Sequence, residues 1–306
     1  MINVSIKQIF TGHAEPIYAL ASNDETSSFY SGSGDGFVGE WSLKSGRFEK
    51  PVAKSESTIY SLLKMDNQPI IFIGLQDGVL NIIDTGNKSI IKSLKLFNSG
   101  IFDMAFLPRL NWLLLASGDG NLGIVDATSF TLKHTIHLSK KSLRCVDVSP
   151  CGDFAIIGAS DHQLYFLDFR DGIKTKQTIP AHKNSVFTAI YKEGYSLLTG
   201  GRDALLKEWD WLHESKEWGF KQSIEAHNYT INKIAKHPSD QWIATSSRDK
   251  TIKIWNFDTL KLLKVINLEK FQDSHTHSIN TLLWIDNETL LSAGDDKKII
   301  AWKITS

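Results

Sequence analysis

Four sets of polar residues recur in this chain of 306 residues, each with a histidine, a serine or threonine, an aspartate and a tryptophan in that order. The sets are His13, Ser31, Asp35 and Trp41; His182, Thr199, Asp203 and Trp209; His227, Thr245, Asp249 and Trp255; and His275, Ser292, Asp296 and Trp302. An aspartate that orients an imidazole beside a hydroxyl is the arrangement of a nucleophilic hydrolase. Such a triad is normally needed once, so four copies favour a structural hydrogen-bond relay from carboxylate through imidazole and hydroxyl to indole.

The aspartates of these sets belong to a longer series at nearly constant spacing. The series is Asp35, Asp77, Asp119, Asp161, Asp203, Asp249 and Asp296, with intervals of 42, 42, 42, 42, 46 and 47 residues. Each aspartate lies between two apolar runs, a pattern that predicts a β-hairpin. A unit of this length, rich in β-branched and aromatic runs such as 241–247 and 251–257 and without helical spacing, predicts four short strands per repeat.

With these residues the chain resembles the WD-repeat family, and the resemblance covers essentially all of it. The Trp-Asp ending itself is present at Trp209-Asp210. The resemblance implies an all-β fold: a seven-bladed β-propeller of four-stranded antiparallel blades, forming a single domain over residues 1–306. Segment 4–10 has strand character and the last repeat ends without an outer strand, so we expect the N-terminal strand to complete the last blade and close the ring.

Repeats two, three and four depart from the four-residue pattern. At the histidine position they carry Ser55, Phe97 and Ser139; at the hydroxyl position Ile73, Leu115 and Ile157; and at the tryptophan position Ile83, Val125 and Leu167. Removing all partners of a buried polar network together can be nearly neutral. We therefore expect apolar packing in place of the relay in these three blades.

Composition narrows the function classes. The 34 basic and 34 acidic side chains give a net charge of zero, which argues against nucleic-acid binding and against attraction to anionic membranes. The first ten residues resemble neither a signal peptide nor a membrane span, and the simplest expectation is a cytoplasmic protein. Two cysteines, Cys145 and Cys151, predict no disulfide framework. His275 and His277 form a His-x-His pair, but His275 belongs to a relay, so we expect no metal site and no cofactor.

The family resemblance implies that partners dock on the face that carries the aspartate turns. Two positions in each repeat point there: one five residues after the relay histidine, and one just before the turn aspartate. The candidate partner-binding residues at these positions are Tyr18, Tyr60, Phe102, Arg144, Phe187, Arg202, Asn232, Arg248, Asn280 and Asp295. Aromatic and arginine side chains dominate protein–protein hot spots. The competing interpretation is that the aromatic members only fill the mouth of the central channel.

These residues indicate a non-catalytic scaffold or adaptor for other proteins or peptides, with no small-molecule substrate. An alternative is recognition of acidic or phosphorylated peptides, or of nucleic acid, by Arg144, Arg202 and Arg248. A propeller enzyme is a further alternative, for which the chain offers little, because its recurrent histidines and aspartates are committed to relays.

Two insertions lengthen the last intervals. Segment 211–219 should extend the turn between the third and outer strands of blade five, where Trp211 or Trp218 is either an exposed contact or packed on a blade edge. Segment 268–274 should rise on the relay face, with Phe271 beside the docking surface.

Overall fold

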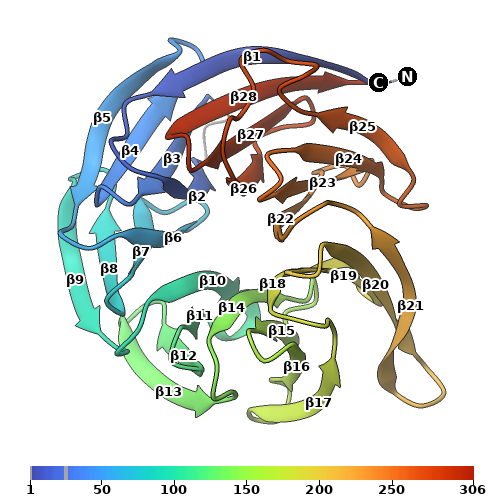
Figure 1. The fold of residues 1–306 in the computed structure, drawn as a ribbon. Coiled ribbons are helices and arrows are strands. Elements are labelled where there is room, and N and C mark those ends of the chain that lie inside the picture. Colours follow the sequence, from blue (N-terminus) through green and yellow to red (C-terminus); the bar gives the residue numbers. More distant parts are fainter. Residues whose placement is uncertain (1, 24–26) are drawn as a thin grey trace. The chain divides into compact units, whose positions relative to one another are not determined.

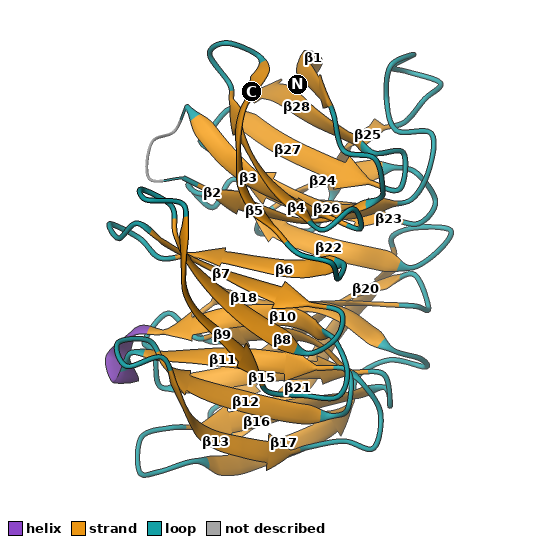
Figure 2. Ribbon diagram, turned by 90° about the vertical axis from the view of Figure 1, so that its left-hand side faces the viewer, coloured by secondary structure: helices purple, strands orange, loops and turns teal. Residues whose placement is uncertain are grey.

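The computed structural model describes residues 2–23 and 27–306, and within them the strands form seven four-stranded antiparallel sheets, the blades of a seven-bladed β-propeller (Figure 1). The predicted all-β fold class is confirmed. The one helical segment of the described residues is a single 3₁₀ turn, η1 (Pro108–Leu110), shown in purple in Figure 2. Strands are favoured because apolar residues, many of them β-branched or aromatic, either alternate with polar ones, as in segment 3–11, or form continuous runs, as in segment 70–75.

The strands of blades 1, 2, 6 and 7 have the following bounds. Blade 1 contains β2 (Ile17–Ser22), β3 (Ser28–Ser33), β4 (Phe37–Ser42) and β5 (Arg47–Lys54). Blade 2 contains β6 (Ile59–Lys64), β7 (Ile70–Leu75), β8 (Val79–Asp84) and β9 (Ser89–Lys95). Blade 6 contains β22 (Ile231–Lys236), β23 (Trp242–Ser247), β24 (Ile252–Asn256) and β25 (Leu262–Ile266). Blade 7 contains β26 (Ile279–Trp284), β27 (Thr289–Gly294), β28 (Lys298–Thr305) and β1 (Asn3–Thr11).

The remaining three blades follow the same order. Blade 3 contains β10 (Ile101–Leu107), β11 (Trp112–Ser117), β12 (Asn121–Asp126) and β13 (Thr131–His137). Blade 4 contains β14 (Leu143–Val148), β15 (Phe154–Ala159), β16 (Gln163–Asp168) and β17 (Lys174–Pro180). Blade 5 contains β18 (Val186–Glu193), β19 (Ser196–Gly201), β20 (Leu205–Leu212) and β21 (Glu217–Glu225).

The N-terminal strand completes blade 7, as predicted. Strand β1 pairs antiparallel with β28, and the register places Ile6 opposite Trp302 and Phe10 opposite Ile299. The predicted segment 4–10 lies within β1. This pairing leaves no unpaired edge on β28, the last strand of the chain.

The chain divides into two compact units. One comprises Met1–Leu75, Asn81–Ser93 and Asn232–Ser306, and the other Gln76–Leu80 and Leu94–Ile231. In the first unit the inner strand β2 contacts the inner strands β6 and β26 of the neighbouring blades; in the second, β14 contacts β10 and β18. The single-domain organisation of residues 1–306 stays a prediction, which cooperative unfolding tests.

The core lies between neighbouring blades. Between blades 3 and 4, fully buried aliphatic residues such as Leu114 and Ile157 pack with the largely buried Phe169. Between β1 and blade 1, the core is aromatic, with Phe10, Phe29 and Trp41. These interfaces hold the aspartate turns in place.

Candidate functional site

The first relay has the predicted connections. The His13 imidazole donates from Nδ1 to Asp35 Oδ2 at 2.9 Å, and its Nε2 lies 2.7 Å from Ser31 Oγ. The Trp41 indole N–H donates to the same hydroxyl at 2.6 Å. In the neutral tautomer that donates from Nδ1, Nε2 accepts from the Ser31 hydroxyl, which itself accepts from the indole, so each polar side-chain atom of this relay has a partner.

The relays of blades 5 and 7 repeat this geometry. His182 joins Asp203 at 2.8 Å and Thr199 at 2.9 Å, and Trp209 donates to Thr199 at 2.9 Å. In blade 7, His275 lies 2.9 Å from Asp296 and 2.8 Å from Ser292, which accepts from Trp302 at 2.8 Å. In blade 6 the indole of Trp255 donates to Thr245 at 2.9 Å. His227 and Asp249 occupy the corresponding positions of that blade.

Three of the relay aspartates, Asp203, Asp296 and Asp35, are held in their charged form. Burial raises the pKa of Asp203, but the hydrogen bond and charge of His182 and the backbone N–H groups of Lys183 and Leu205 outweigh it, so the pKa falls to about 2. The same balance, with His275 as the main lowering partner, depresses the pKa of Asp296. For Asp35, burial is outweighed by the backbone N–H of Phe37 and then by His13, and the pKa is again lowered.

Two of the candidate partner-binding residues in the first unit join neighbouring blades. Asn280 Nδ2 donates to the Ile17 carbonyl at 3.1 Å and to Asp295 Oδ1 at 2.7 Å. Asn232 Nδ2 makes the equivalent bond to the Ile279 carbonyl at 2.9 Å. Ile17 and Ile279 occupy the same position in their repeats, so this asparagine position forms a repeated inter-blade bond that the sequence analysis missed.

The other candidates in the first unit are a tyrosine pair and an arginine. Tyr18 and Tyr60 meet edge to face with ring centroids 5.4 Å apart, and both are half-buried. Burial, followed by the negative charge of Asp295, raises the pKa of the Tyr18 phenol, which therefore stays neutral at physiological pH. Arg248 is exposed at its turn.

In the second unit, one arginine lies between two aromatic rings. The guanidinium carbon of Arg144 is 4.5 Å from the centroid of Phe102 and 5.3 Å from that of Phe187, and its Nε donates to Ser160 Oγ at 2.8 Å. These residues come from the inner strands of blades 3, 4 and 5. The structure thus brings together three of the predicted residues, here called the Phe–Arg–Phe cluster. Arg202, in the same unit, is exposed.

The repeat pattern also agrees with comparisons to known proteins. A family model described as "WD domain, G-beta repeat" matches residues 4–42, 218–256 and 267–303. Actin-interacting protein 1 of Drosophila melanogaster is 24% identical over 304 residues, covering 97% of this chain and 47% of that protein. Protein transport protein sec13 of Aspergillus fumigatus is 28% identical over 253 residues, covering 70% of this chain and 80% of that protein. In these three segments and in its four-stranded blades, the chain is similar to WD-repeat proteins.

The chain spans about half the length of the Drosophila actin-interacting protein. A further relative is autophagy-related protein 16 of Arabidopsis thaliana, 24% identical over 198 residues, which cover 64% of this chain and 38% of that protein. The matched segments of the family model lie in β1 with blade 1, from the end of blade 5 through most of blade 6, and in blade 7. These segments contain the relay residues of blades 1, 6 and 7, whereas the relay of blade 5 lies outside them.

The three repeats without a relay are less uniform than predicted. In blade 3 the buried Phe97 takes the histidine position, and the Asn98 backbone N–H reaches Asp119 at 3.3 Å. In blade 4, however, Ser139 Oγ and the Tyr165 hydroxyl both donate to Asp161 Oδ2, the latter at 2.6 Å. The expectation of apolar packing is therefore wrong for blade 4. Burial, followed by the bond to Asp161, raises the pKa of Tyr165 to about 12.

The insertion 211–219 forms a packed hairpin. It extends β20 and β21, as predicted, with the turn at 213–216. Trp218 stacks on Phe166 of blade 4 with centroids 5.5 Å apart, and its backbone N–H donates to Gln177 Oε1 at 2.8 Å. Of the two interpretations left open, the structure supports packing on a blade edge for Trp218.

The second insertion also packs inward at its aromatic residue. The ring of Phe271 lies 5.5 Å from that of Trp302, edge to face, and covers the indole of the blade 7 relay. Phe271 is half-buried there. Its place beside a docking surface stays a prediction.

In residues 2–23 and 27–306, no group of three or more His, Cys, Asp and Glu side chains is arranged to hold a metal ion. No helix in the described part of the chain is long and apolar enough to cross a membrane. Neither the buried Cys145 nor the exposed Cys151 forms a disulfide.

Proposed function

We propose that this chain is a non-catalytic scaffold that binds protein or peptide partners on the face that carries the aspartate turns, through side chains of the inner strands. The relatives support an interaction role, because the name of the Drosophila relative states an interaction with actin and that of the Aspergillus relative a part in protein transport. The class of partner that this chain binds is inferred below from its own exposed side chains.

The observation that carries the proposal is the Phe–Arg–Phe cluster. An arginine whose guanidinium lies against two rings is pre-organised, so less rotamer entropy is lost when a partner covers it. Phe102, Arg144 and Phe187 are each half-buried and keep part of their surface accessible. Partly exposed aromatic and arginine groups on rigid strands have the composition of binding hot spots.

The relays do not support catalysis. The hydroxyls that a nucleophilic mechanism would use, Ser31, Thr199 and Ser292, belong to residues with 0% exposure. Each also accepts a hydrogen bond from an indole. A nucleophile has to reach its substrate, so hydroxyls enclosed in this way are suited to holding turns and not to attacking a substrate.

A second candidate is recognition of acidic or phosphorylated peptides. The exposure of Arg202 and Arg248 favours it, since accessible guanidinium groups bind carboxylates and phosphates bidentately. Arg144 is less suited to this, because its guanidinium is engaged with two rings and Ser160. The neutral net charge favours peptides over nucleic acid as the anionic partner.

The expected compartment is the cytoplasm. Free cysteines such as the exposed Cys151 persist as thiols in a reducing environment. Fractionation of cells that produce the tagged chain tests this part of the proposal.

The proposal is tested by affinity purification of the tagged chain and of the variant Phe102→Ala/Arg144→Ala from the native cells. We expect at least one reproducible partner to be lost from the variant and retained by Leu132→Ala, a control on the outer strand β13, where Leu132 is 43% exposed. Retention of every partner by a folded Phe102→Ala/Arg144→Ala variant contradicts the proposal. Loss of a partner from Arg202→Ala but not from the double variant supports the anionic-peptide alternative.

A further inference from the structure

Three rings that pack together beside blade 1, those of Phe10, His13 and Trp41, have no counterpart at the same repeat positions beside blade 2. In blade 1, Trp41 packs against Phe10 of the preceding strand with centroids 5.8 Å apart, and against His13 at the same separation. The 42-residue period places Val52, Ser55 and Ile83 at the positions of Phe10, His13 and Trp41. Each substitution replaces a planar ring by a smaller side chain, which removes volume at the place where β5 meets blade 2.

Blades 3 and 4 also lack the relay, but each has a ring in its place. Phe97 fills the histidine position of blade 3 and is 4% exposed. In blade 4, Tyr165 reaches Asp161 from β16 and is 9% exposed. The corresponding positions of blade 2 carry Ser55 and Asn81, which are too small to fill the space.

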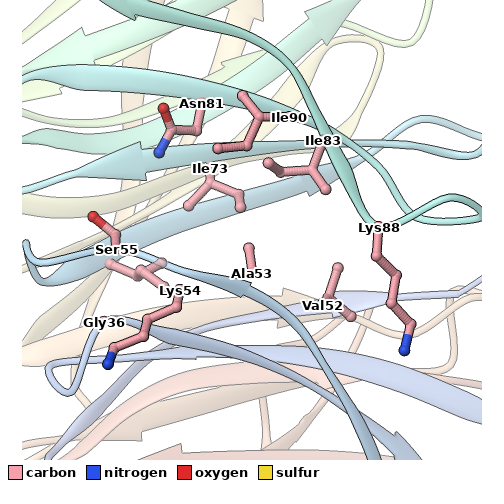
Figure 3. Close-up of a pocket in the computed structure, with 11 residues that line it drawn as sticks. Gly36, Val52, Ala53, Lys54, Ser55, Ile73, Asn81, Ile83, Lys88 and Ile90 are labelled. Atoms are coloured by element: carbon pink, nitrogen blue, oxygen red, sulfur yellow. The ribbon is translucent and has the colours of Figure 1, made fainter.

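A cavity occupies this place in blade 2. It has a volume of about 220 Å³ and lies between β5 and the strands β7, β8 and β9, all within the first unit. Figure 3 shows Ile73 and Ile83 on one side of it and Val52 on the other. We name it the blade-2 pocket. It forms where the ring positions of blade 1 are occupied by small side chains.

The polar groups of the blade-2 pocket have a defined arrangement. Ser55 and Asn81 line one end of it, and Lys54 and Lys88 lie at opposite ends (Figure 3). Among the described residues that line the pocket there is no Asp or Glu. An acidic group beside the pocket would therefore meet positive charge at either end.

We propose that the blade-2 pocket binds an aromatic side chain of a partner protein segment whose neighbouring residues are acidic. An apolar cavity of about 150 Å³ accepts benzene, so the volume here suffices for a phenyl or indole ring. The amide of Asn81 accepts the N–H of an indole, and the two lysines pair with carboxylates on either side of the ring. This site adds to the binding face proposed above and does not depend on it.

A protein segment is favoured over a free small molecule by the surface beside the pocket. Ile90 lines it and is 64% exposed, and the adjacent Ile91 is 43% exposed. Ile90 belongs to β9, the outer strand of its blade, so its exposed apolar surface adjoins the pocket, whereas Ile91, the next residue, faces the other side of the sheet. A segment that inserts one ring also covers Ile90, whereas a free ring does not.

The test uses the whole chain and short peptides whose central tryptophan carries fluorine, observed by ¹⁹F NMR. The probes are acetyl-Glu-Glu-Trp-Glu-Glu-amide, its lysine counterpart with Trp between two Lys pairs, and fluorinated indole alone. We expect saturable binding of the acidic probe, at least about tenfold tighter than that of the lysine probe or of indole, since a charge pair contributes on this scale. Equal binding of acidic and lysine probes, or indole binding as tight as the acidic probe, overturns the proposal.

Filling the pocket is the decisive variant. Val52→Phe/Ile83→Trp installs the pair of rings found beside blade 1, and we expect this variant to fold and to lose binding of the acidic probe. Retained binding by the folded variant overturns the proposal.

Lys54→Glu/Lys88→Glu changes only the charges at the rim of the pocket and should weaken binding of the acidic probe at least about tenfold. Lys140→Glu/Lys174→Glu makes the same change in net charge outside the pocket lining and should bind as wild type does. Phe102→Ala/Arg144→Ala should also bind the acidic probe as wild type does, which separates this site from the Phe–Arg–Phe cluster.

Discussion

The ring of Phe10 lies edge-on to the indole of Trp41, with centroids 5.8 Å apart and an interplanar angle of 71°. Phe10 belongs to β1, the outer strand of blade 7, while Trp41 ends the relay of blade 1. The N-terminal strand therefore both completes one blade and covers the core of the next. Phe10 and Phe29, 5.2 Å apart, extend the same aromatic cluster.

Replacing Phe10 by alanine should destabilise the protein strongly. Phe10 is 2% exposed, and the loss of a buried phenylalanine costs about 3 kcal/mol or more. Urea unfolding followed by tryptophan fluorescence measures this change. Leu132→Ala, at an exposed outer-strand position, should change the unfolding free energy by less than about 0.5 kcal/mol.

The same unfolding curves test the domain organisation. If residues 1–306 are one domain, both variants unfold in a single transition, and two separate transitions contradict that prediction.

The relay of blade 5 should make the free energy of unfolding fall as the pH is lowered below about 4. The pKa of Asp203 is about 2 in the folded chain, below the ordinary value of about 3.9 that the unfolded chain has. Its contribution is present above the unfolded value and is lost as the pH falls through the folded one. Between about pH 4 and pH 2, wild type should lose stability more steeply than Asp203→Asn.

Denaturant unfolding at several pH values in this window measures the two slopes. Asp66→Asn, an exposed aspartate, serves as the control and should follow wild type. Parallel slopes for wild type and Asp203→Asn argue against a charged relay aspartate.

Tyr165 should stabilise blade 4 through Asp161. Tyr165→Phe removes one hydrogen bond and should cost about 1 kcal/mol at neutral pH. Because the folded pKa of Tyr165 is raised to about 12, its contribution is present below the ordinary value of about 10 and is lost as the pH rises through about 12. Absorbance of tyrosinate during an alkaline titration should show one late-ionising phenol fewer in the variant than in wild type, where Tyr18 and Tyr191 also have a raised pKa. An unchanged titration would contradict the assignment.

Trp218 should anchor the hairpin of segment 211–219. It stacks on Phe166 and lies 6.0 Å from Tyr191, so Trp218→Ala should cost about 2 kcal/mol and expose the hairpin to proteases. Leu212, 49% exposed, provides the control Leu212→Ala, for which little change is expected. Limited proteolysis with mass spectrometry compares the two variants. Equal cleavage of both would mean that the tryptophan does not hold the hairpin.

How far the sequence predicts this molecule depends on how local each interaction is. The aspartate spacing predicts seven blades and the connections of His13, because relay residues sit at constant offsets within a repeat. The bond from Asn280 to Ile17 was missed because it joins two repeats, whose relative position a sequence offset does not give.

The relay-free blades show a second limit. Tyr165 lies four residues after Asp161, so alternation along the strand could have placed its hydroxyl near the carboxylate, yet no repeated motif drew attention to it. The blade-2 pocket was missed for a different reason. It results from Val52 and Ser55 on one strand and its following turn together with Ile83 on a later strand, and only packing shows that nothing refills the space.

The central claim is that partners bind the face at the inner strands, and photo-cross-linking in the native cells tests it most directly. Benzoylphenylalanine replaces Phe187 on the inner strand β18 in one variant and Leu132 on the outer strand β13 in another. We expect irradiation to give a discrete adduct with a partner protein at position 187 and none at 132. Adducts at position 132 with none at 187, in folded variants, would contradict the claim.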